Sequence, residues 1–228
     1  VVPENFSFRM TDEEYRVLEK IKNSIPVCYL ADHADFALGI VTGNNKKFLS
    51  AEKTEHSEMV LKGTDICKYH INPAKQYLRF EPEQFQQVAP LEIYRAPEKL
   101  LYRFISNQLV VAYDDRQMLS LNSCNIVIPK IEGMQIKYIL AILNSSVSQF
   151  VYQKEFHSIK VLRAHMEHIP IPRVGKAIQN EIIAMTEPLI CGMGKEAAET
   201  CQKRLDCRIM DLFRLSAEEQ WIIRHALH

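Results

Sequence analysis

The sequence lacks the features of a membrane protein or a disulfide-stapled secreted one. No apolar run approaches the roughly 18 residues that cross a bilayer, and Val1-Val2-Pro3-Glu4 has neither the basic start nor the apolar core of a signal peptide. The six cysteines are scattered through 228 residues, a length that needs no disulfide staples. We therefore expect a cytoplasmic protein with reduced thiols and no membrane. Because no initiator methionine is present, we also expect a piece of a longer protein.

The sequence also lacks a net charge. Lysine plus arginine number 28, and aspartate plus glutamate also number 28. This balance excludes a strongly basic nucleic-acid binder at the level of the whole chain, although a local basic face is still allowed. The hydrophobic fraction of 47% is enough to build a core.

Familiar catalytic motifs are missing. Gly43 is followed by Asn44-Asn45-Lys46, so the spacing of a phosphate-binding Walker loop fails. No Gly-x-Ser-x-Gly elbow and no Cys-x-x-Cys pair occurs, and Cys67 with His70 has no matching second pair. Asp114-Asp115 is better interpreted as a turn than as a carboxylate pair. The sequence predicts no catalytic residue and no metal site.

The pattern predicts an α+β fold. Thr11 and Glu14 have the spacing of a capping box, which predicts a helix over 11–23. A β-rich region follows as far as Pro129, and it includes a hairpin around Ser106-Asn107. Its strands are expected to form a curved, mostly antiparallel sheet with exposed loops. The expected strands are 27–30, 36–41, 59–61, 77–80, 91–94, 100–105, 108–113 and 125–128.

Helices are expected to pack on this sheet and to form a C-terminal tail. Apolar residues at helical spacing predict one helix over 135–151, and a strand is expected over 158–162. Ile169-Pro170-Ile171-Pro172 stops regular structure, so we divide the chain into a first domain, 1–175, and a helical tail, 176–228. Ser216 and Glu219 form a capping box that opens a last short helix.

The stretch Gly39–Leu49 is the first candidate site. Glycine and asparagine tolerate positive φ, so Thr42-Gly43-Asn44-Asn45 predicts a tight turn between two strands, followed by Lys46 and Lys47. Two interpretations remain open: a solvated hairpin turn, or a polar, cationic loop that reads a ligand.

A second candidate region is basic. Between Ile126 and Lys176, seven basic residues stand against three acidic ones, whereas the helices after Lys176 are acidic in balance. Lys160 and Arg163 lie beside the Ile-Pro boundary, and His165 lies close to them. An ordinary solvated face and a face that meets DNA phosphates both fit this pattern.

Five strings resemble one family in the same order. Gly39-Ile-x-Thr-Gly-Asn-Asn-x-x-Phe48 is similar to the opening of the TaqI-like C-terminal specificity domain, the target recognition domain of adenine-specific DNA methyltransferases and of type IIG restriction–modification enzymes. The other four strings are Gly63-x-Asp65-Ile66, Leu143-Asn144-Ser145, Ile169-Pro170-Ile171-Pro172, and the helical tail with Gln179, Ile182 and Leu205-Asp206. Together they span roughly residues 10–225.

The resemblance implies sequence-specific recognition of double-stranded DNA. The residue types fit this expectation, because asparagine amides can pair with adenine, while lysine and arginine can bind guanine or phosphate. The DNA-binding residues that we expect are Thr42, Asn44, Asn45, Lys46, Lys47, Lys160, Arg163 and His165.

The resemblance also implies catalysis elsewhere in the parent protein. The family's Asn-Pro-Pro-aromatic motif is missing, because the nearest string is Asn72-Pro73-Ala74-Lys75. We expect a covalently linked methyltransferase domain upstream, possibly with an endonuclease, that uses S-adenosylmethionine, and no cofactor on this chain. Two alternatives remain open: a domain that docks against protein, and a fragment of a type I specificity subunit.

Overall fold

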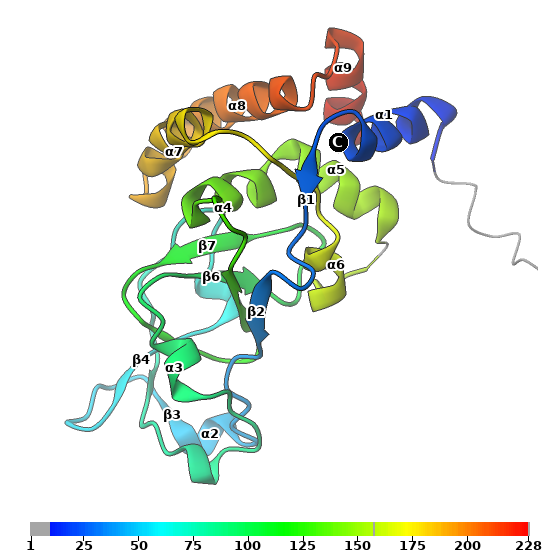
Figure 1. Cartoon of the computed structure of the whole chain (residues 1–228). Helices are drawn as coiled ribbons and strands as arrows, with labels where there is room; N and C mark the ends of the chain where they lie inside the picture. Colours follow the sequence, from blue (N-terminus) through cyan, green and yellow to red (C-terminus); the bar gives the residue numbers. More distant parts are fainter. Residues whose placement is uncertain (1–9, 157, 228) are drawn as a thin grey trace, which may run out of the picture.

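The computed structural model describes residues 10–156 and 158–227. Val1–Glu4, which entered the signal-peptide argument, lie outside this range. The chain is organised around a central antiparallel sheet, with a helical layer above it and a smaller lobe below it (Figure 1). The strands of this sheet, in spatial order, are β2 (Ala34–Ala37), β9 (Cys124–Pro129), β6 (Lys99–Arg103) and β7 (Val111–Asp114).

Both faces of the central sheet are buried. Successive side chains of a strand point to opposite faces, so each strand contributes to two cores. Leu100 and Tyr102 pack into the core under the helices. Leu101, between them, packs into the core of the lower lobe, as Ala112 does from β7. The sheet is therefore a wall shared by two hydrophobic cores.

Helices cover the upper face of the sheet. α4 and α5 lie directly on it, and α7 and α8 lie above α4 and α5 (Figure 1). α1 and α9 pack beside α5. These helices are α1 (Asp12–Asn23), α4 (Ile136–Asn144), α5 (Ser146–Glu155), α7 (Lys176–Ile190), α8 (Lys195–Leu212) and α9 (Ala217–Ala226).

The lower lobe is built from short strands and single helical turns. Its strands, in order, are β3 (Leu49–Ser50), β5 (Tyr77–Leu78), β4 (Glu58–Leu61) and β8 (Leu119–Ser120), and only β4 with β8 is parallel. The turns are α2 (Asn45–Phe48), α3 (Leu91–Tyr94), η1 (Gly63–Asp65) and η2 (Pro82–Gln84). A separate pair joins β1 (Val27–Cys28) to β10 (Ile171–Pro172), next to the short helix α6 (Arg163–Glu167).

The α+β prediction is confirmed, as are the capping boxes of α1 and α9 and the hairpin between β6 and β7. Three local predictions were wrong. Residues 91–94 form a helical turn, 135–151 splits into two helices at Ser145, and 158–162 forms a single β-bridge, Lys160 to Ile105. Ser145 breaks the helix because its extended backbone lets the hydroxyl accept from Ser148 N at 3.2 Å.

The division at residue 175 stays a prediction. Side chains of α7, α8 and α9 belong to the same hydrophobic core as those of α4 and α5. None of the helices that the structure describes is long and apolar enough to cross a membrane.

Strand β7 lies at the edge of the sheet, yet its backbone is buried under the helices. The side chain of Asn144 supplies what a neighbouring strand would: Val111 N donates to its Oδ1 at 3.1 Å, and its Nδ2 donates to Val111 O at 2.8 Å. Gln149 pairs with Leu109 in the same way: Leu109 N donates to Gln149 Oε1, and Gln149 Nε2 donates to Leu109 O, both at 2.9 Å. Two amide side chains therefore replace a strand at this edge.

We expect Asn144→Ala to lower the free energy of unfolding by about 2–3 kcal/mol, because it leaves the buried Val111 N–H without an acceptor. Urea denaturation followed by circular dichroism measures this. Asn180→Ala is the control, since that amide makes an exposed contact to Gln135. Equal effects of the two substitutions would contradict the structural role of Asn144.

A fully buried ion pair ties β6 to the end of β7. Lys99 Nζ lies 2.5 Å from Asp114 Oδ2, and both side chains are completely buried. Asp114 also accepts from Arg116 N at 2.9 Å and Met118 N at 3.0 Å, so it shapes the loop that follows β7. Burial lowers the pKa of Lys99, and the Asp114 carboxylate opposes that shift.

We expect Lys99→Met to lower the free energy of unfolding by about 3–5 kcal/mol, because it leaves the buried Asp114 carboxylate without its counter-ion. The double variant Lys99→Met/Asp114→Asn is expected to recover part of this loss in the same denaturation measurement. A double variant that is less stable than Lys99→Met would show that the unpaired carboxylate does not cause the stability loss of Lys99→Met.

Candidate nucleic-acid interface

Two glycines let the backbone of the lower lobe pack unusually closely. A Cβ added at Gly39 would overlap the carbonyl of Leu121, and one at Gly63 would lie 2.6 Å from Ser123 O. Gly39 N also donates to Asn125 Oδ1 at 3.2 Å. These contacts fix the start of the first candidate loop against segment 121–125. Gly43 differs, since its φ of 75° gives the turn itself its shape.

The expected hairpin at Thr42–Asn45 was wrong. β2 pairs with β9, and β3 pairs with β5, so the two strands around the loop are not partners. Asn44 instead caps the single helical turn α2, where its Oδ1 accepts from Lys47 N at 3.2 Å. Asparagine favours the cap position because its side-chain oxygen accepts a hydrogen bond from a backbone N–H group that the first helical turn leaves free.

Thr42 positions this loop from inside. Its side chain is buried, and its hydroxyl donates to Asn45 Oδ1 at 2.6 Å and accepts from Asn44 N at 3.2 Å. The Asn45 amide is thus held through its oxygen. Within the described chain, the Asn45 nitrogen makes no hydrogen bond with protein, so it is available to an outside acceptor.

A polar groove of about 490 Å³ opens beside this loop. Its lining combines amides, lysines and one hydroxyl, and none of the described lining residues is acidic. The polar members are Asn45, Lys46, Lys62, Gln76, Asn122 and Ser123. Such a surface offers hydrogen-bond donors, acceptors and positive charge to a ligand.

Lys47 points away from this groove. Its Nζ donates to Gln84 Oε1 at 3.3 Å and lies 4.6 Å from the centre of the Phe48 ring. The side chain is exposed, so the ammonium can still contact a phosphate.

Lys160 and Arg163 form a second group, next to α6. Lys160 is exposed and lies 6.0 Å from the Phe104 ring. Arg163 stacks over Phe36 of β2 at 5.1 Å and pairs with Glu167 at 2.7 Å. Figure 1 shows α6 beside β2 and α2 farther down the molecule, so the two groups flank β2 at separate places.

His165 serves the protein itself. Its Nδ1 accepts from Leu162 N at 3.2 Å, and its ring stacks on Phe156 at 4.5 Å. Burial lowers the pKa of His165, so the ring is neutral at pH 7 and offers no charge to a phosphate. A DNA contact from His165 stays a prediction without support from this geometry.

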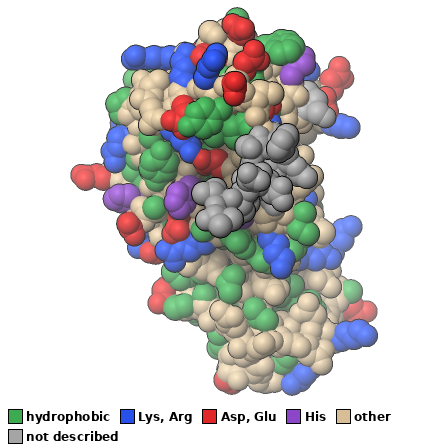
Figure 2. All heavy atoms as spheres, turned by 90° about the vertical axis from the view of Figure 1, so that its right-hand side faces the viewer, with side chains coloured by type: hydrophobic (Ala, Val, Ile, Leu, Met, Phe, Trp, Pro, Cys, Tyr) green, Lys and Arg blue, Asp and Glu red, His purple; other side chains and the backbone are tan. Residues whose placement is uncertain are grey.

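Charge on the face shown in Figure 2 is interspersed. Basic and acidic side chains are mixed over the upper half, and the lower half is mostly uncharged, with separate basic and acidic groups. On this face, contacts with a polyanion would therefore come from discrete cations and not from a continuous basic patch.

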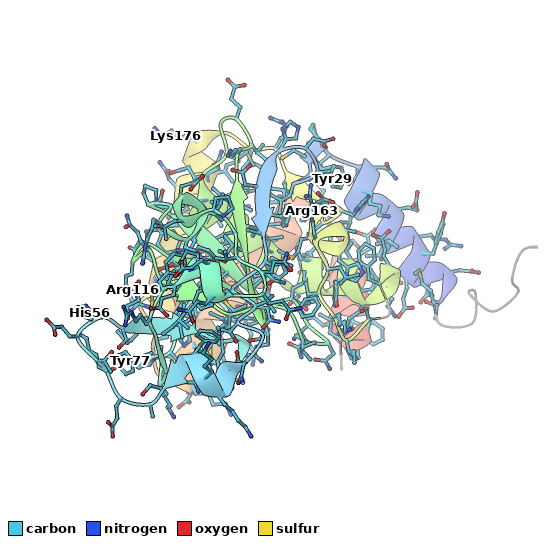
Figure 3. All side chains as sticks on the ribbon, turned by 90° about the horizontal axis from the view of Figure 1, so that it is seen from below. Tyr29, His56, Tyr77, Arg116, Arg163 and Lys176 are labelled. Carbon is cyan, nitrogen blue, oxygen red and sulfur yellow. The ribbon has the colours of Figure 1, made fainter. Side chains whose placement is uncertain are left out.

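Sequence reasoning missed several polar residues of the lower lobe. Lys62, Gln76 and Asn122 join the groove from three separate segments. Arg116 and Tyr77 line another hollow, of about 330 Å³, and lie on a different side from Arg163 when seen from below (Figure 3). Of these residues, only Lys62 could have been found from the sequence, because it directly precedes the string Gly63-x-Asp65-Ile66 that carries the resemblance.

Several strings that carried the resemblance contain residues with structural roles. Asn144 completes the sheet edge. Asp206 of α8 accepts from Ser146 N at 2.8 Å, at the start of α5. Gln179 is buried; it accepts from Gln135 N at 2.8 Å and donates to Gly133 O at 2.8 Å. These residues hold the scaffold together.

Comparisons with known proteins agree with this architecture. The sequence model of the TaqI-like C-terminal specificity domain matches residues 58–171. No curated protein matches in sequence. The type IIG restriction endonuclease BpuSI superposes with a TM-score of 0.57 at 11% identity, over 95% of this chain and 32% of its own.

Two further solved structures are similar. The type IIL restriction-modification enzyme MmeI, solved in complex with DNA, gives a TM-score of 0.50 at 11% identity, over 90% of this chain and 36% of its own. The HsdS subunit from Thermoanaerobacter tengcongensis gives a TM-score of 0.45 at 14% identity, over 94% of this chain and 50% of its own. The chain thus spans between about a third and a half of these proteins.

We expect Gly39→Ala to destabilise the protein by at least about 2–3 kcal/mol, because its methyl group collides with backbone and not with a movable side chain. Gly175→Ala is the matched control, since no atom lies within 4 Å of the added methyl. Thermal unfolding of the two variants compares them directly. A Gly39→Ala protein as stable as the control would contradict the close packing of this loop.

Proposed function

The chain belongs to the family of TaqI-like C-terminal specificity domains, and on this basis we propose that it recognises a specific sequence in double-stranded DNA. The observation that carries the proposal is the polar groove beside α2. It brings three amides and two lysines together, with no carboxylate among the described lining residues. These are the side chains that read base edges.

The groove supports direct base readout. A side-chain amide can pair with the adenine edge in the major groove, and a lysine can bind the guanine edge. Asn45 is the best placed amide because the Thr42 hydroxyl already fixes its orientation at 2.6 Å. Fixing the side chain before binding reduces the entropy that binding must overcome.

Phosphate contacts are assigned to the exposed cations outside the groove. Lys160 and Arg163 lie next to α6, and Lys47 lies on α2 farther down the molecule (Figure 1); Lys47 and Lys160 form no ion pair among the described residues. Contacts from such cations to phosphates set the register of a protein on a duplex without reading sequence.

We propose that the parent protein is an adenine-N6 DNA methyltransferase or a fused methyltransferase–endonuclease. The string nearest the methyltransferase motif, Asn72-Pro73-Ala74-Lys75, lacks its second proline and its aromatic residue, and the Asn72 amide donates to Cys67 Sγ at 3.2 Å. Methyl transfer is therefore assigned to a linked domain outside this chain.

Selection of bound duplexes from a randomised pool, followed by affinity titration at several salt concentrations, tests the proposal. We expect Asn45→Ala to relax the preference at one base position, with a discrimination loss of about 1–3 kcal/mol. We expect Lys47→Gln to weaken binding to all sequences and to reduce the magnitude of the salt slope by about one.

Arg204→Gln is the control, because Arg204 is an exposed cation on α8, at the opposite end of the molecule from α2 (Figure 1). Its affinity and salt slope are expected to match the wild type. No binding by the wild-type chain at low salt would overturn the proposal and favour a protein-docking domain.

A further inference from the structure

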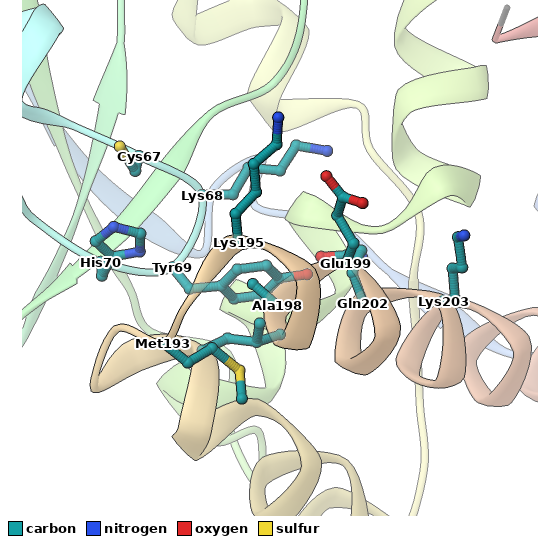
Figure 4. Close-up of a pocket in the computed structure, with 11 residues that line it drawn as sticks. Cys67, Lys68, Tyr69, His70, Met193, Lys195, Ala198, Glu199, Gln202 and Lys203 are labelled. Atoms are coloured by element: carbon teal, nitrogen blue, oxygen red, sulfur yellow. The ribbon is translucent and has the colours of Figure 1, made fainter.

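A cavity of about 570 Å³ lies far from the proposed DNA interface, between the loop 67–70 and the helices α7 and α8 (Figure 4). This volume is within the range of about 300–1,000 Å³ that small-molecule sites occupy. The loop belongs to the recognition region, whereas Leu189, Met193 and Ala198 come from the tail. Residues from both parts of the chain therefore line the cavity.

Tyr69 is held in this cavity wall at an energetic cost. Its φ of 73° is the left-handed conformation, which bulky side chains rarely adopt. Hydrogen bonds to the β7 backbone impose it: Tyr69 N donates to Val111 O at 2.7 Å, and Tyr113 N donates to Tyr69 O at 3.1 Å. Strain of this kind gathers at functional sites.

The hydroxyl of Tyr69 adds a second cost. The side chain is only 2% exposed, yet no described residue forms a hydrogen bond with the Tyr69 Oη. The buried Nε2 of Gln202 on α8 is also without an acceptor among the described residues. In Figure 4 the hydroxyl points toward the α8 segment that carries Gln202. Buried donors without acceptors are rare, and each one calls for an explanation.

The charge around the cavity favours an anion. Among the lining residues, Lys68, Lys195 and Lys203 stand against one carboxylate, that of Glu199. A second carboxylate, that of Asp206 on α8, lies behind Lys68 and Tyr69, so the lysines still outnumber the acids. Lys68 Nζ donates to Asn144 O at 3.2 Å, which leaves two of its N–H groups for a ligand. Burial lowers the pKa of Lys68, and the Asp206 carboxylate opposes that shift. Burial and Asp206 both raise the pKa of Tyr69, while the neighbouring Gln202 amide opposes them, so the phenol keeps its proton and can donate it to an acceptor.

We propose that this cavity binds a small organic anion, with its carboxylate or phosphate near Lys68, Gln202 and the Tyr69 hydroxyl. Its apolar body would lie against Leu189, Met193 and Ala198. One acceptor group would satisfy the two unpaired donors and partly neutralise the lysines. A bound anion would also link the loop 67–70 to α8. The inference is independent of DNA recognition.

Thermal unfolding and titration calorimetry of the whole chain test this, with hexanoate and monohexyl phosphate as probes. We expect both to raise the melting temperature and to bind with one-to-one stoichiometry. Hexanol and hexylamine carry the same apolar body without the negative charge, and inorganic phosphate carries the charge without the body. These three are expected to bind at least about tenfold more weakly.

Tyr69→Phe separates a ligand site from a structural hydroxyl. Because it removes a buried donor that has no acceptor, we expect the ligand-free melting temperature to stay equal or rise. The affinity for hexanoate is expected to fall by about tenfold, the worth of one hydrogen bond to a charged group. Tyr15→Phe, at an exposed tyrosine of α1, is the control and is expected to change neither quantity.

Three results would overturn the proposal. The first is no response to either anion, and the second is equal binding of hexanol and hexanoate. The third is a lower ligand-free melting temperature for Tyr69→Phe, which would show that the hydroxyl is already bonded in the protein. Since none of these measurements uses DNA, failure of the DNA proposal would leave them unaffected.

Discussion

The buried edge of β7 is the constraint on which the rest of the structure depends. An edge strand under a helical layer has N–H and C=O groups that water cannot reach, and each needs a partner. Asn144 and Gln149 supply those partners from the helices above, and the backbone of Tyr69 supplies another from a loop. The same contacts set how α4 and α5 lie on the sheet.

The central sheet then divides the molecule into two hydrophobic cores. Its upper face carries Tyr102 and Val127 into the helical core, and its lower face carries Leu101 and Ile126 into the lower lobe. The upper core includes the long helices, whereas the lower lobe consists of short elements with polar connections. Loops on a rigid scaffold are a common place for recognition, because they can vary without disturbing the core.

The lower lobe reaches its shape through close backbone packing more than through regular pairing. Gly39 and Gly63 bring two segments against the loop 121–123, and the groove opens where these segments meet. Thr42 shows how a buried side chain can prepare an exposed one, since its hydroxyl orients Asn45. The groove therefore depends on Gly39, Thr42 and Gly63, which do not line it.

The sequence by itself determined the fold class, the helical C-terminal tail, the capping boxes of α1 and α9, the β6–β7 hairpin and the family. Each depends on local periodicity or on short strings. Only the tertiary structure decided what those strings do: Asn144 completes a sheet edge, and Asn44 caps a helical turn where a hairpin was expected. It alone brought Lys62, Gln76 and Asn122 into one groove and left the Tyr69 hydroxyl unpaired. The physical reason is that such contacts join segments far apart in the chain, and no local pattern records which segments meet.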